Sequence, residues 1–189
     1  MLGKWDALYN GADLRRPYGD VLTYVLGGAF LAGLAVEDWG CGLGWFKKYA
    51  SGPYLGIDGS ASPFADVIAD LRDYRSTTPG LFLRHVLEHN TDWKRILENA
   101  LASFEQRMVL VVFTPFSDYT HVIAENDWAP GVRIPDISFA MSDLTSLFSG
   151  WLVTEESLDT SSQYGQEHVF FLDKQYKENG GPAGDETDA

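Results

Sequence analysis

Apolar residues along this chain gather in short runs separated by turn-forming and polar residues. Runs of four to eight apolar residues bounded by Gly, Pro, Asp or Ser are typical of strands buried in a parallel sheet. By this criterion we predict seven strands, at residues 35–39, 53–58, 67–70, 81–85, 108–113, 151–158 and 167–173. The fifth run is almost continuously apolar, which indicates a strand covered on both faces.

Other stretches place apolar residues three and four positions apart, the spacing of one helix face. They predict helices at residues 4–10, 20–32, 45–50, 90–104 and 142–148. Asp20 can cap the second helix and Gly33 can end it. We expect its buried face to consist of Val21, Leu22, Val25, Leu26 and Phe30. Asn90 or Thr91 can cap the fourth helix, which would bury Trp93, Ile96, Leu97, Ala100 and Leu101.

The alternation of strands and helices predicts an α/β fold with a parallel sheet and helices on both faces. Residues 59–63 are turn-forming, which leaves almost no room for a helix between the second and third strands. Residues 114–135 are rich in Pro, Asp and aromatic residues without clear periodicity. Long connections of this kind are usually functional, so we predict a loop on the substrate side of the fold.

The length of 189 residues and the hydrophobic content of 45% predict one folded domain, residues 1–174. Residues 175–189 lose apolar content and predict an acidic, disordered tail. No apolar run reaches the length of a membrane span, and the first residues lack the layout of a signal peptide. The single cysteine, Cys41, fits a reducing compartment, so we expect a cytoplasmic protein.

The formal net charge is −13, from 14 Lys and Arg against 27 Asp and Glu. Removing the tail leaves the domain acidic. Proteins that bind nucleic acid usually present a basic face to the phosphates. The charge therefore argues against a DNA or RNA substrate.

Three alternating glycines, Gly40, Gly42 and Gly44, join the first strand to the following helix. Glycine permits positive φ and has no Cβ, so a ligand can lie directly against this turn. The free N–H groups of the next helix suit the polar parts of a nucleotide-like ligand. A purely steric tight turn is the alternative. A dinucleotide pattern, G-x-G-x-x-G, would need glycine where Trp45 stands.

Four segments in order extend this motif: Asp38 with its G-x-G-x-G, then residues 54–58, 66–71 and 85–89. Together they resemble the class I S-adenosylmethionine-dependent methyltransferases, in particular a compact small-molecule branch. The resemblance implies a Rossmann-like, seven-stranded and mostly parallel sheet whose last strand is antiparallel, with the helix between strands two and three short or missing. Two features depart from the family, Glu37 in the first strand and residues 105–107 before the fifth.

S-adenosylmethionine is the cofactor that the resemblance implies. Asp58, about twenty residues after Asp38, can accept two hydrogen bonds from a ribose diol, although an ordinary capping aspartate is the alternative. The resemblance places Asp70 and Leu71 at the adenine, with Asp73 as a competitor, and Asp38 at the methionine ammonium. The full predicted cofactor set is Asp38, Gly40, Cys41, Gly42, Gly44, Asp58, Gly59, Asp70, Leu71 and Arg84.

Two further points concern residues at or near the predicted cofactor site. Cys41 is expected to be a small packing residue rather than a reactive thiol. Arg15 or Arg16 could pair with the methionine carboxylate in bidentate fashion, or could form a solvated basic pair on a loop.

Methyl transfer to a hydroxyl requires a base for the departing proton. The candidate bases are His85, Glu88, His89 and His121, and we expect His168 to be structural. His85, Glu88 and His89 have the i, i+3, i+4 spacing of one helix face. Three alternatives remain for this trio: local hydrogen bonds that stabilise the turn, a zinc-peptidase motif, and a metal site of the kind in ubiquinone-pathway O-methyltransferases. His85 stands where that metal signature has an acid, and we predict no metal.

The predicted function is methyl transfer from S-adenosylmethionine to a small-molecule or sugar-like acceptor, at oxygen. The alternative is a catalytically inactive cofactor-binding or scaffold domain of the same fold, because the segments after Asp58 and before Met108 are altered. A nicotinamide-dependent oxidoreductase is disfavoured by Trp45. The oligomeric state stays open.

Overall fold

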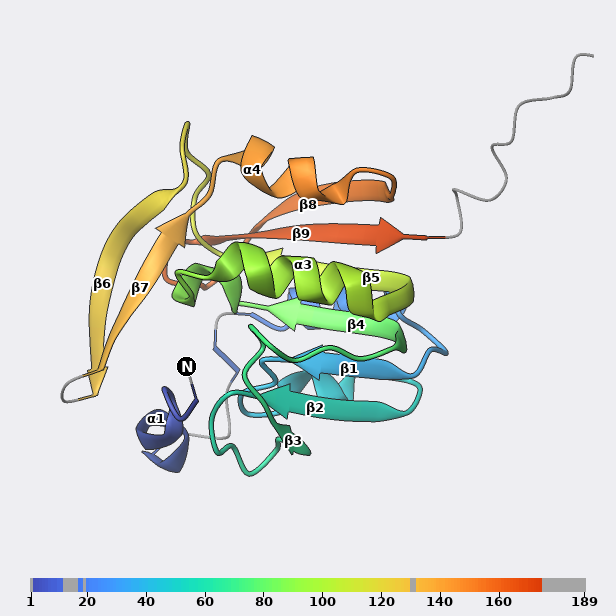
Figure 1. Cartoon of the computed structure of the whole chain (residues 1–189), viewed down its shortest axis with the longest axis horizontal. Coiled ribbons are helices and arrows are strands. Elements are labelled where there is room, and N and C mark those ends of the chain that lie inside the picture. Colours follow the sequence, from blue (N-terminus) through green and yellow to red (C-terminus); the bar gives the residue numbers. More distant parts are fainter. Residues whose placement is uncertain (1, 12–16, 19, 130–131, 175–189) are drawn as a thin grey trace, which may run out of the picture.

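Seven strands form one twisted sheet in the order β3-β2-β1-β4-β5-β9-β8 (Figure 1). The structure is a computed structural model that describes residues 2–11, 17–18, 20–129 and 132–174. β1 to β5 run parallel, whereas β9 lies antiparallel between β5 and β8. The predicted Rossmann-like sheet and its antiparallel last strand are confirmed. Arg15, Arg16 and the tail 175–189 lie outside the described residues.

The strands agree with the predicted runs to within a few residues. Their bounds are β1 Val36–Trp39, β2 Tyr54–Asp58, β3 Val67–Ile68, β4 Thr78–Arg84, β5 Phe104–Val112, β8 Leu152–Asp159 and β9 Gln166–Asp173. Asp38 of β1 pairs in register with Gly56 of β2 and Phe82 of β4. The carboxyl ends of these three central strands therefore meet at one edge, where ligands bind in open α/β sheets.

The connection from β2 to β3 contains no helix in residues 59–66, all of which are described, as the sequence predicts. Asp66 holds this short connection against β2. Its Oδ2 accepts the N–H of Gly56 at 2.8 Å, and its own N–H donates to the Gly56 carbonyl at 2.8 Å. The parallel pairing of β2 with β3 is thus kept without a crossover helix.

Helices cover both faces of the sheet (Figure 1). α3 (Trp93–Ser103), α4 (Met141–Thr145) and the 3₁₀ turn η3 (Ser146–Phe148) pack on one face, over Trp39, Leu83, Met108 and Phe170. α2 (Leu22–Phe30) and the 3₁₀ turn η1 (Trp45–Lys48) pack on the other, over Phe82, Val109 and Val111. The predicted caps of α3 are wrong, because Asp92 precedes its first residue and no side chain caps it.

The predicted apolar face of α2 is wrong for three of its five residues, whereas Phe30 does pack against the core. The buried side of this helix consists of Thr23, Tyr24, Gly27 and Gly28. Val21, Leu22 and Val25 are 39%, 39% and 46% exposed. Glycine decides the orientation, because a Cβ on Gly27 would lie 2.5 Å from the Phe82 ring and one on Gly28 would lie 2.5 Å from the Tyr49 carbonyl. The helix approaches the sheet closely where Gly27 and Gly28 carry no side chain, beside Thr23 and Tyr24.

Residues 114–135, predicted as a loop, contain most of a β-hairpin. β6 (His121–Ala129) pairs antiparallel with β7 (Val132–Ser138) in a separate two-stranded sheet. Two register shifts interrupt the pairing, and Pro135 lies within β7, which together conceal the period-2 pattern. The hairpin and α1 (Asp6–Gly11) both stand beyond the carboxyl ends of the parallel strands (Figure 1).

Glu37, which departs from the family pattern, is buried in β1 and finds polar partners. Its Oε2 accepts hydrogen bonds from the Trp39 indole at 2.8 Å and from the Ser76 hydroxyl at 2.7 Å. Within the part of the chain that is described, no helix has the length and apolarity needed to cross a lipid bilayer.

Candidate functional site

A cavity of about 410 Å³ opens at the carboxyl ends of β1, β2 and β4 and is covered on one side by α1. Small-molecule sites commonly occupy about 300–1,000 Å³. Ten residues of the predicted site line it: Gly40, Cys41, Gly42, Asp58, Gly59, Asp70, Leu71, Arg84, His85 and His89. Asp38, Gly44, Glu88 and His121 do not belong to the lining. The motifs dispersed along the sequence are thus brought together around one space.

The glycine turn has the positive φ angles that the spacing predicts, +76° at Gly40, +51° at Gly42 and +68° at Gly44. A Cβ on Gly40 would lie 2.3 Å from Val86 Cγ2, and one on Gly44 would lie 2.7 Å from Phe64 Cβ. Gly40 and Gly42 therefore present bare main chain to the cavity. Gly44 serves the packing of the turn.

Asp58 ends β2 with both carboxylate oxygens engaged. Oδ1 accepts the N–H of Ser60 at 2.8 Å, and Oδ2 accepts the N–H of Gly42 at 2.9 Å. Oδ2 also accepts the Tyr9 hydroxyl from α1 at 3.2 Å. Burial raises the pKa of Asp58, and the bonds from Gly42, Ser60 and Tyr9 only partly offset this. Of these three donors Tyr9 is the one side chain, because Gly42 and Ser60 donate through the main chain.

Asp38 lies beneath the turn rather than in the cavity wall. It is buried, and its Oδ2 accepts the Tyr54 hydroxyl at 2.8 Å. Burial raises the pKa of Asp38 to about 7. Cys41 is likewise buried, burial raises the pKa of its thiol, and its Sγ lies 3.9 Å from the Phe64 carbonyl. This environment fits a packing residue.

Asp70 lines the cavity beside Leu71 and forms a bidentate pair with Arg72, at 2.7 Å between Oδ2 and Nη2 and 3.0 Å between Oδ1 and Nε. The Arg72 hydrogen bonds hold the pKa of Asp70 below its ordinary range. Asp73, the competing acid, pairs with Arg95 at the surface and does not line the cavity.

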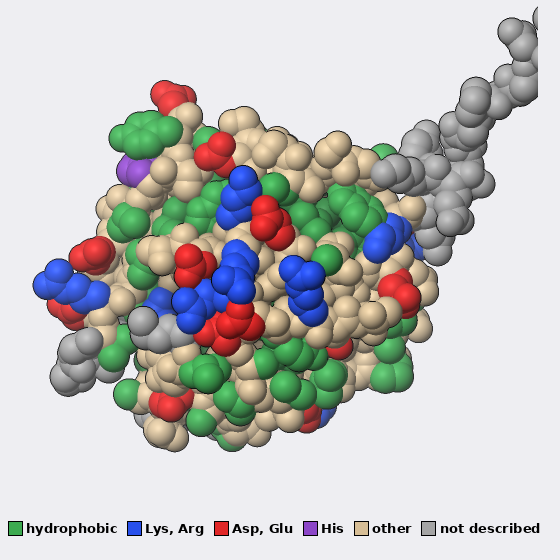
Figure 2. All heavy atoms as spheres, in the orientation of Figure 1, with side chains coloured by type: hydrophobic (Ala, Val, Ile, Leu, Met, Phe, Trp, Pro, Cys, Tyr) green, Lys and Arg blue, Asp and Glu red, His purple; other side chains and the backbone are tan. Residues whose placement is uncertain are grey.

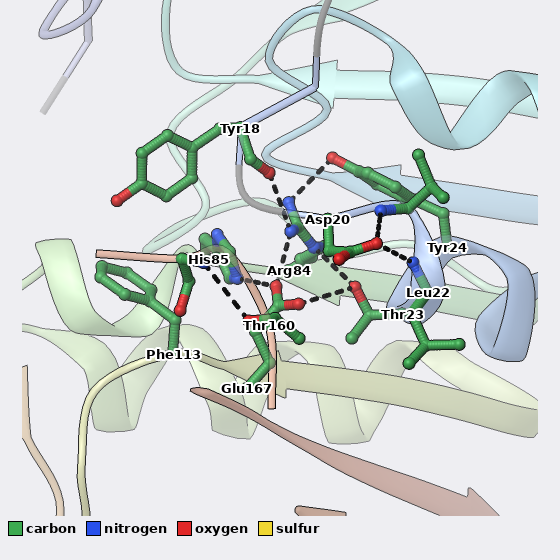
Figure 3. A network of polar contacts seen from close by, with 12 residues as sticks. Tyr18, Asp20, Leu22, Thr23, Tyr24, Arg84, His85, Phe113, Thr160 and Glu167 are labelled. Carbon is green, nitrogen blue, oxygen red and sulfur yellow. Dashed lines mark hydrogen bonds and ion pairs between the residues drawn. The ribbon is translucent and has the colours of Figure 1, made fainter. Parts of the chain in front are cut away.

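Arg84 ends β4 at the centre of a buried polar network (Figure 3). Its Nη2 lies 2.5 Å from Oε1 of Glu167 and 3.0 Å from the Tyr18 carbonyl. Nη1 donates to the Tyr24 hydroxyl at 2.9 Å, and Nε donates to the Thr23 hydroxyl at 3.0 Å. Each guanidinium nitrogen thus has a protein partner, and the charge is balanced within the fold. Arg84 therefore links β4 to α2 and β9 through hydrogen bonds. It also lines the cavity.

His85 follows Arg84 and is the one non-glycine residue with positive φ in the described part of the chain, at +55°. Its ring packs against Phe113 at 4.6 Å and edge-on to Tyr18 at 5.8 Å between centroids. Nε2 lies 2.5 Å from Oε1 of Glu167. Burial, with smaller contributions from Arg84 and His89, lowers the pKa of His85 well below its ordinary value.

Glu88 is completely buried and does not line the cavity. Its Oε1 accepts the N–H of Phe113 at 2.6 Å, and burial raises its pKa to about 7. This geometry supports the local interpretation, in which Glu88 stabilises the turn after β4. Among the described residues, no group of three His, Cys, Asp or Glu side chains could hold a metal ion.

His89 belongs to the 3₁₀ turn η2 (Leu87–His89) and lines the cavity. Its Nδ1 lies 3.0 Å from the Pro135 carbonyl and 3.3 Å from Oδ1 of Asp136, both on β7. Its ring stands edge-on to Trp5, which lines the cavity from the chain's first residues, at 5.2 Å between centroids. Nε2 has no hydrogen-bond partner among the described residues, so it is the ring nitrogen left for a ligand.

The other two histidines lie elsewhere. His121 stacks on Tyr119 at 4.4 Å and its Nδ1 lies 2.9 Å from the Tyr119 carbonyl, away from the cavity. His168 is buried in β9, where its Nδ1 lies 2.7 Å from the Ser157 hydroxyl. The fold therefore brings His85 and His89 to the cavity and leaves His121 outside it.

Sequence reasoning missed four polar residues that shape this site: Tyr9, Thr23, Asp136 and Glu167. Tyr9 and Thr23 lie in segments predicted as helices from apolar periodicity, which carries no information about hydrogen bonds. Asp136 lies 47 residues after His89 in sequence. It belongs to β7, whose hairpin falls mostly in residues 114–135, the segment expected to be a loop. A buried charge inside a strand, as at Glu167 in β9, was the one available signal.

The sequence matches no protein-family model and no curated protein sequence. Solved structures do resemble the fold. The Burkholderia thailandensis 1,6-didemethyltoxoflavin-N1-methyltransferase, solved with 1,6-didemethyltoxoflavin and S-adenosylhomocysteine, matches with a TM-score of 0.63 and 15% identity over 82% of this chain and 79% of its own.

Two further structures show the same likeness. The magnesium protoporphyrin IX methyltransferase of Synechocystis PCC 6803, solved with S-adenosylhomocysteine, has a TM-score of 0.58 and 16% identity over 90% of this chain and 93% of its own. An S-adenosylmethionine-dependent methyltransferase of Mesorhizobium loti has a TM-score of 0.55 and 16% identity over 76% of this chain and 92% of its own. The chain thus has the fold of the class I S-adenosylmethionine-dependent methyltransferases.

The molecular surface carries charges of both signs. On the face shown in Figure 2, Lys and Arg side chains stand among Asp and Glu side chains without merging into one basic area. Two ion pairs of this kind join Arg72 to Asp92 at 3.1 Å and Arg95 to Asp73. This face is mixed in charge.

Proposed function

We propose that this protein is an S-adenosylmethionine-dependent methyltransferase that acts on a hydroxyl of a small-molecule or sugar-like acceptor. One observation carries the proposal: the same cavity joins the glycine turn and Asp58 at one end to the unpartnered Nε2 of His89 at the other. The similar structures solved with S-adenosylmethionine or S-adenosylhomocysteine bound support the choice of cofactor.

The residues at the turn fit that cofactor chemically. Gly40 and Gly42 offer main chain with no Cβ. Asp58 offers a carboxylate whose Oδ2 already accepts a hydrogen bond from a hydroxyl, that of Tyr9. A ribose diol would take the place of Tyr9. Asp70 and Leu71 would meet the adenine. When bound, the cofactor supplies a methyl group on a positively charged sulfur.

The chain itself would align the acceptor with the methyl group, exclude water from the point of transfer and accept the departing proton. Trp5, Tyr18 and Leu8 wall the cavity with apolar surface, which limits water at the point of transfer. A neutral histidine accepts a hydroxyl proton near pH 7 without a large pKa shift. His89 suits this role better than His85, because Nε2 of His85 already faces Glu167 at 2.5 Å.

A catalytically inactive scaffold domain of the same fold is the second candidate, and two contacts favour it. Tyr9 occupies Oδ2 of Asp58, and Arg72 occupies both oxygens of Asp70. A protein that holds these contacts permanently would bind the cofactor weakly or not at all and would transfer nothing.

An assay with S-adenosylmethionine labelled in its methyl group separates the two candidates. The protein is incubated with hydroxylated small molecules and sugars, and labelled product and S-adenosylhomocysteine are quantified. Turnover with one acceptor, lost in His89→Ala, supports the transferase. The absence of labelled product with every acceptor, whether or not the cofactor binds, supports the inactive domain.

A further inference from the structure

We infer that Asp136, on the β7 strand of the hairpin, is a positioning residue that fixes the tautomer and orientation of His89. The inference rests on the proposed function for its catalytic meaning, but its physical content concerns one side-chain pair and can be measured without cofactor or acceptor. Nδ1 of His89 lies 3.3 Å from Oδ1 of Asp136.

The two groups that face Nδ1 of His89 are both acceptors. One is the Pro135 carbonyl at 3.0 Å and the other is the Asp136 carboxylate. Neither can donate a hydrogen bond, because Asp136 is ionised and a carbonyl has no proton. Hydrogen bonds and His89 contacts outweigh burial and hold the pKa of Asp136 below its ordinary value. The proton of the neutral imidazole therefore belongs on Nδ1, which leaves a lone pair on Nε2.

Asp136 is itself held in place from three sides. Its Oδ2 accepts the Asn126 amide at 2.8 Å, the Gln163 amide at 3.0 Å and the Tyr164 hydroxyl at 2.8 Å. The side chain is completely buried. Oδ1 forms no hydrogen bond among the described residues and lies 3.3 Å from Nδ1 of His89, within ion-pair distance. Oδ2 therefore anchors the carboxylate, and Oδ1 faces the His89 imidazole.

The His89 ring is confined on its other sides as well. Trp5 lies edge-on at 5.2 Å and Phe113 lies at 5.4 Å between centroids. With Nδ1 tied to β7, the ring can present only Nε2 to the cavity. A lone pair at that nitrogen is what proton abstraction from a hydroxyl requires.

The substitution Asp136→Asn gives a definite expectation. The three donors around Oδ2 will hold the carboxamide oxygen at that position, because they need an acceptor. The amide NH₂ then takes the place of Oδ1 and turns a donor toward His89. A donor facing Nδ1 competes with the Pro135 carbonyl, which still accepts from Nδ1–H, and shifts the equilibrium toward the tautomer with the proton on Nε2. In that tautomer Nε2 has no lone pair for the cavity.

Nitrogen-15 NMR of histidine-labelled protein tests this directly, because the chain has only four histidines and single His→Ala variants assign them. At a pH where His89 is neutral, the wild type should show a protonated Nδ1 and an unprotonated Nε2. Asp136→Asn should shift His89 toward the Nε2–H form. Asp127→Asn, on the exposed part of the same hairpin, should leave the spectrum unchanged.

A wild-type His89 that carries its proton on Nε2 would overturn the inference, and this result does not depend on whether Asp136→Asn folds. An unchanged tautomer in a folded Asp136→Asn protein would also overturn it. Cofactor binding is measured separately on the same samples. If the wild type does not bind S-adenosylhomocysteine, the proposed function is contradicted, whereas the result on the His89 tautomer remains valid.

Discussion

The Tyr9 hydroxyl lies 3.2 Å from Oδ2 of Asp58, the oxygen that also accepts the N–H of Gly42. This bond joins α1 to the end of β2 across the mouth of the cavity. Tyr9 therefore occupies the position in which a ligand hydroxyl could donate to the carboxylate. A ligand hydroxyl that donates to Oδ2 would have to displace or share this contact.

Tyr9→Phe should strengthen binding of S-adenosylhomocysteine by roughly two- to tenfold, since a net hydrogen bond is worth about 0.5–1.5 kcal/mol. The ring keeps its packing, and only the competing hydroxyl is lost. Isothermal titration calorimetry measures the change. Tyr119→Phe, at a hydroxyl-bearing residue that is 66% exposed, is the control. Weaker binding in Tyr9→Phe would mean that Tyr9 supports the ligand rather than competing with it.

Gly40→Ala should destabilise the fold by about 2–4 kcal/mol, from a Cβ at positive φ and a forced contact with Val86. Gly33→Ala separates these causes, because Gly33 has a φ of +80°, close to the +76° of Gly40, and nothing lies within 4 Å of its Cβ position. Urea unfolding of both variants gives the difference. Equal losses of unfolding free energy in Gly40→Ala and Gly33→Ala would show that Val86 moves aside at no cost, which contradicts the expectation.

Glu88→Gln should flatten the dependence of stability on pH. The pKa of Glu88 is raised to about 7 by burial, from an ordinary 4.5, so the unfolded chain ionises first as pH rises. Stability is therefore lost between about pH 4.5 and 7, and Gln cannot titrate. Between pH 5 and 8 the wild type should lose about 2–3 kcal/mol more than Glu88→Gln. Parallel curves of unfolding free energy against pH would contradict this.

The parallel sheet was predictable because its strands are apolar runs with turn residues at their ends, and those runs are local features of the sequence. The glycine turn and Asp58 were predictable for a similar reason, since each directly ends a strand. The face of α2 was not, because its packing depends on how closely Gly27 can approach Phe82, which lies 55 positions away (82 minus 27).

The contacts around His89 and Arg84 could not be read from the sequence either. Asp136 meets His89 only after β7 docks on η2, and Glu167 meets Arg84 only after β9 pairs beside β5. Neither pair has a local signature. His121 shows the reverse case, a histidine with suitable chemistry that the hairpin carries away from the cavity.

His89→Ala should keep the affinity for S-adenosylhomocysteine within about threefold and lower turnover about 10²–10⁴-fold, the usual contribution of acid–base assistance. His121→Ala is the matched control and should turn over normally. Cofactor affinity and steady-state rates with an identified acceptor give both quantities. Normal turnover in the His85, His89 and His121 variants would indicate a basic nitrogen or thiolate acceptor and would contradict the hydroxyl assignment.

Titration of the protein with S-adenosylhomocysteine tests the central claim, that the cavity at the glycine turn binds the cofactor. We expect micromolar affinity in the wild type and a loss of at least about tenfold in Asp58→Ala, because hydrogen bonds to a charged group contribute about 1.5–3 kcal/mol. Gly42→Val should also weaken binding, whereas Asp73→Ala, outside the cavity, should not. The absence of both heat and thermal shift in the wild type, or stabilisation by NAD in preference to S-adenosylmethionine, would contradict the account.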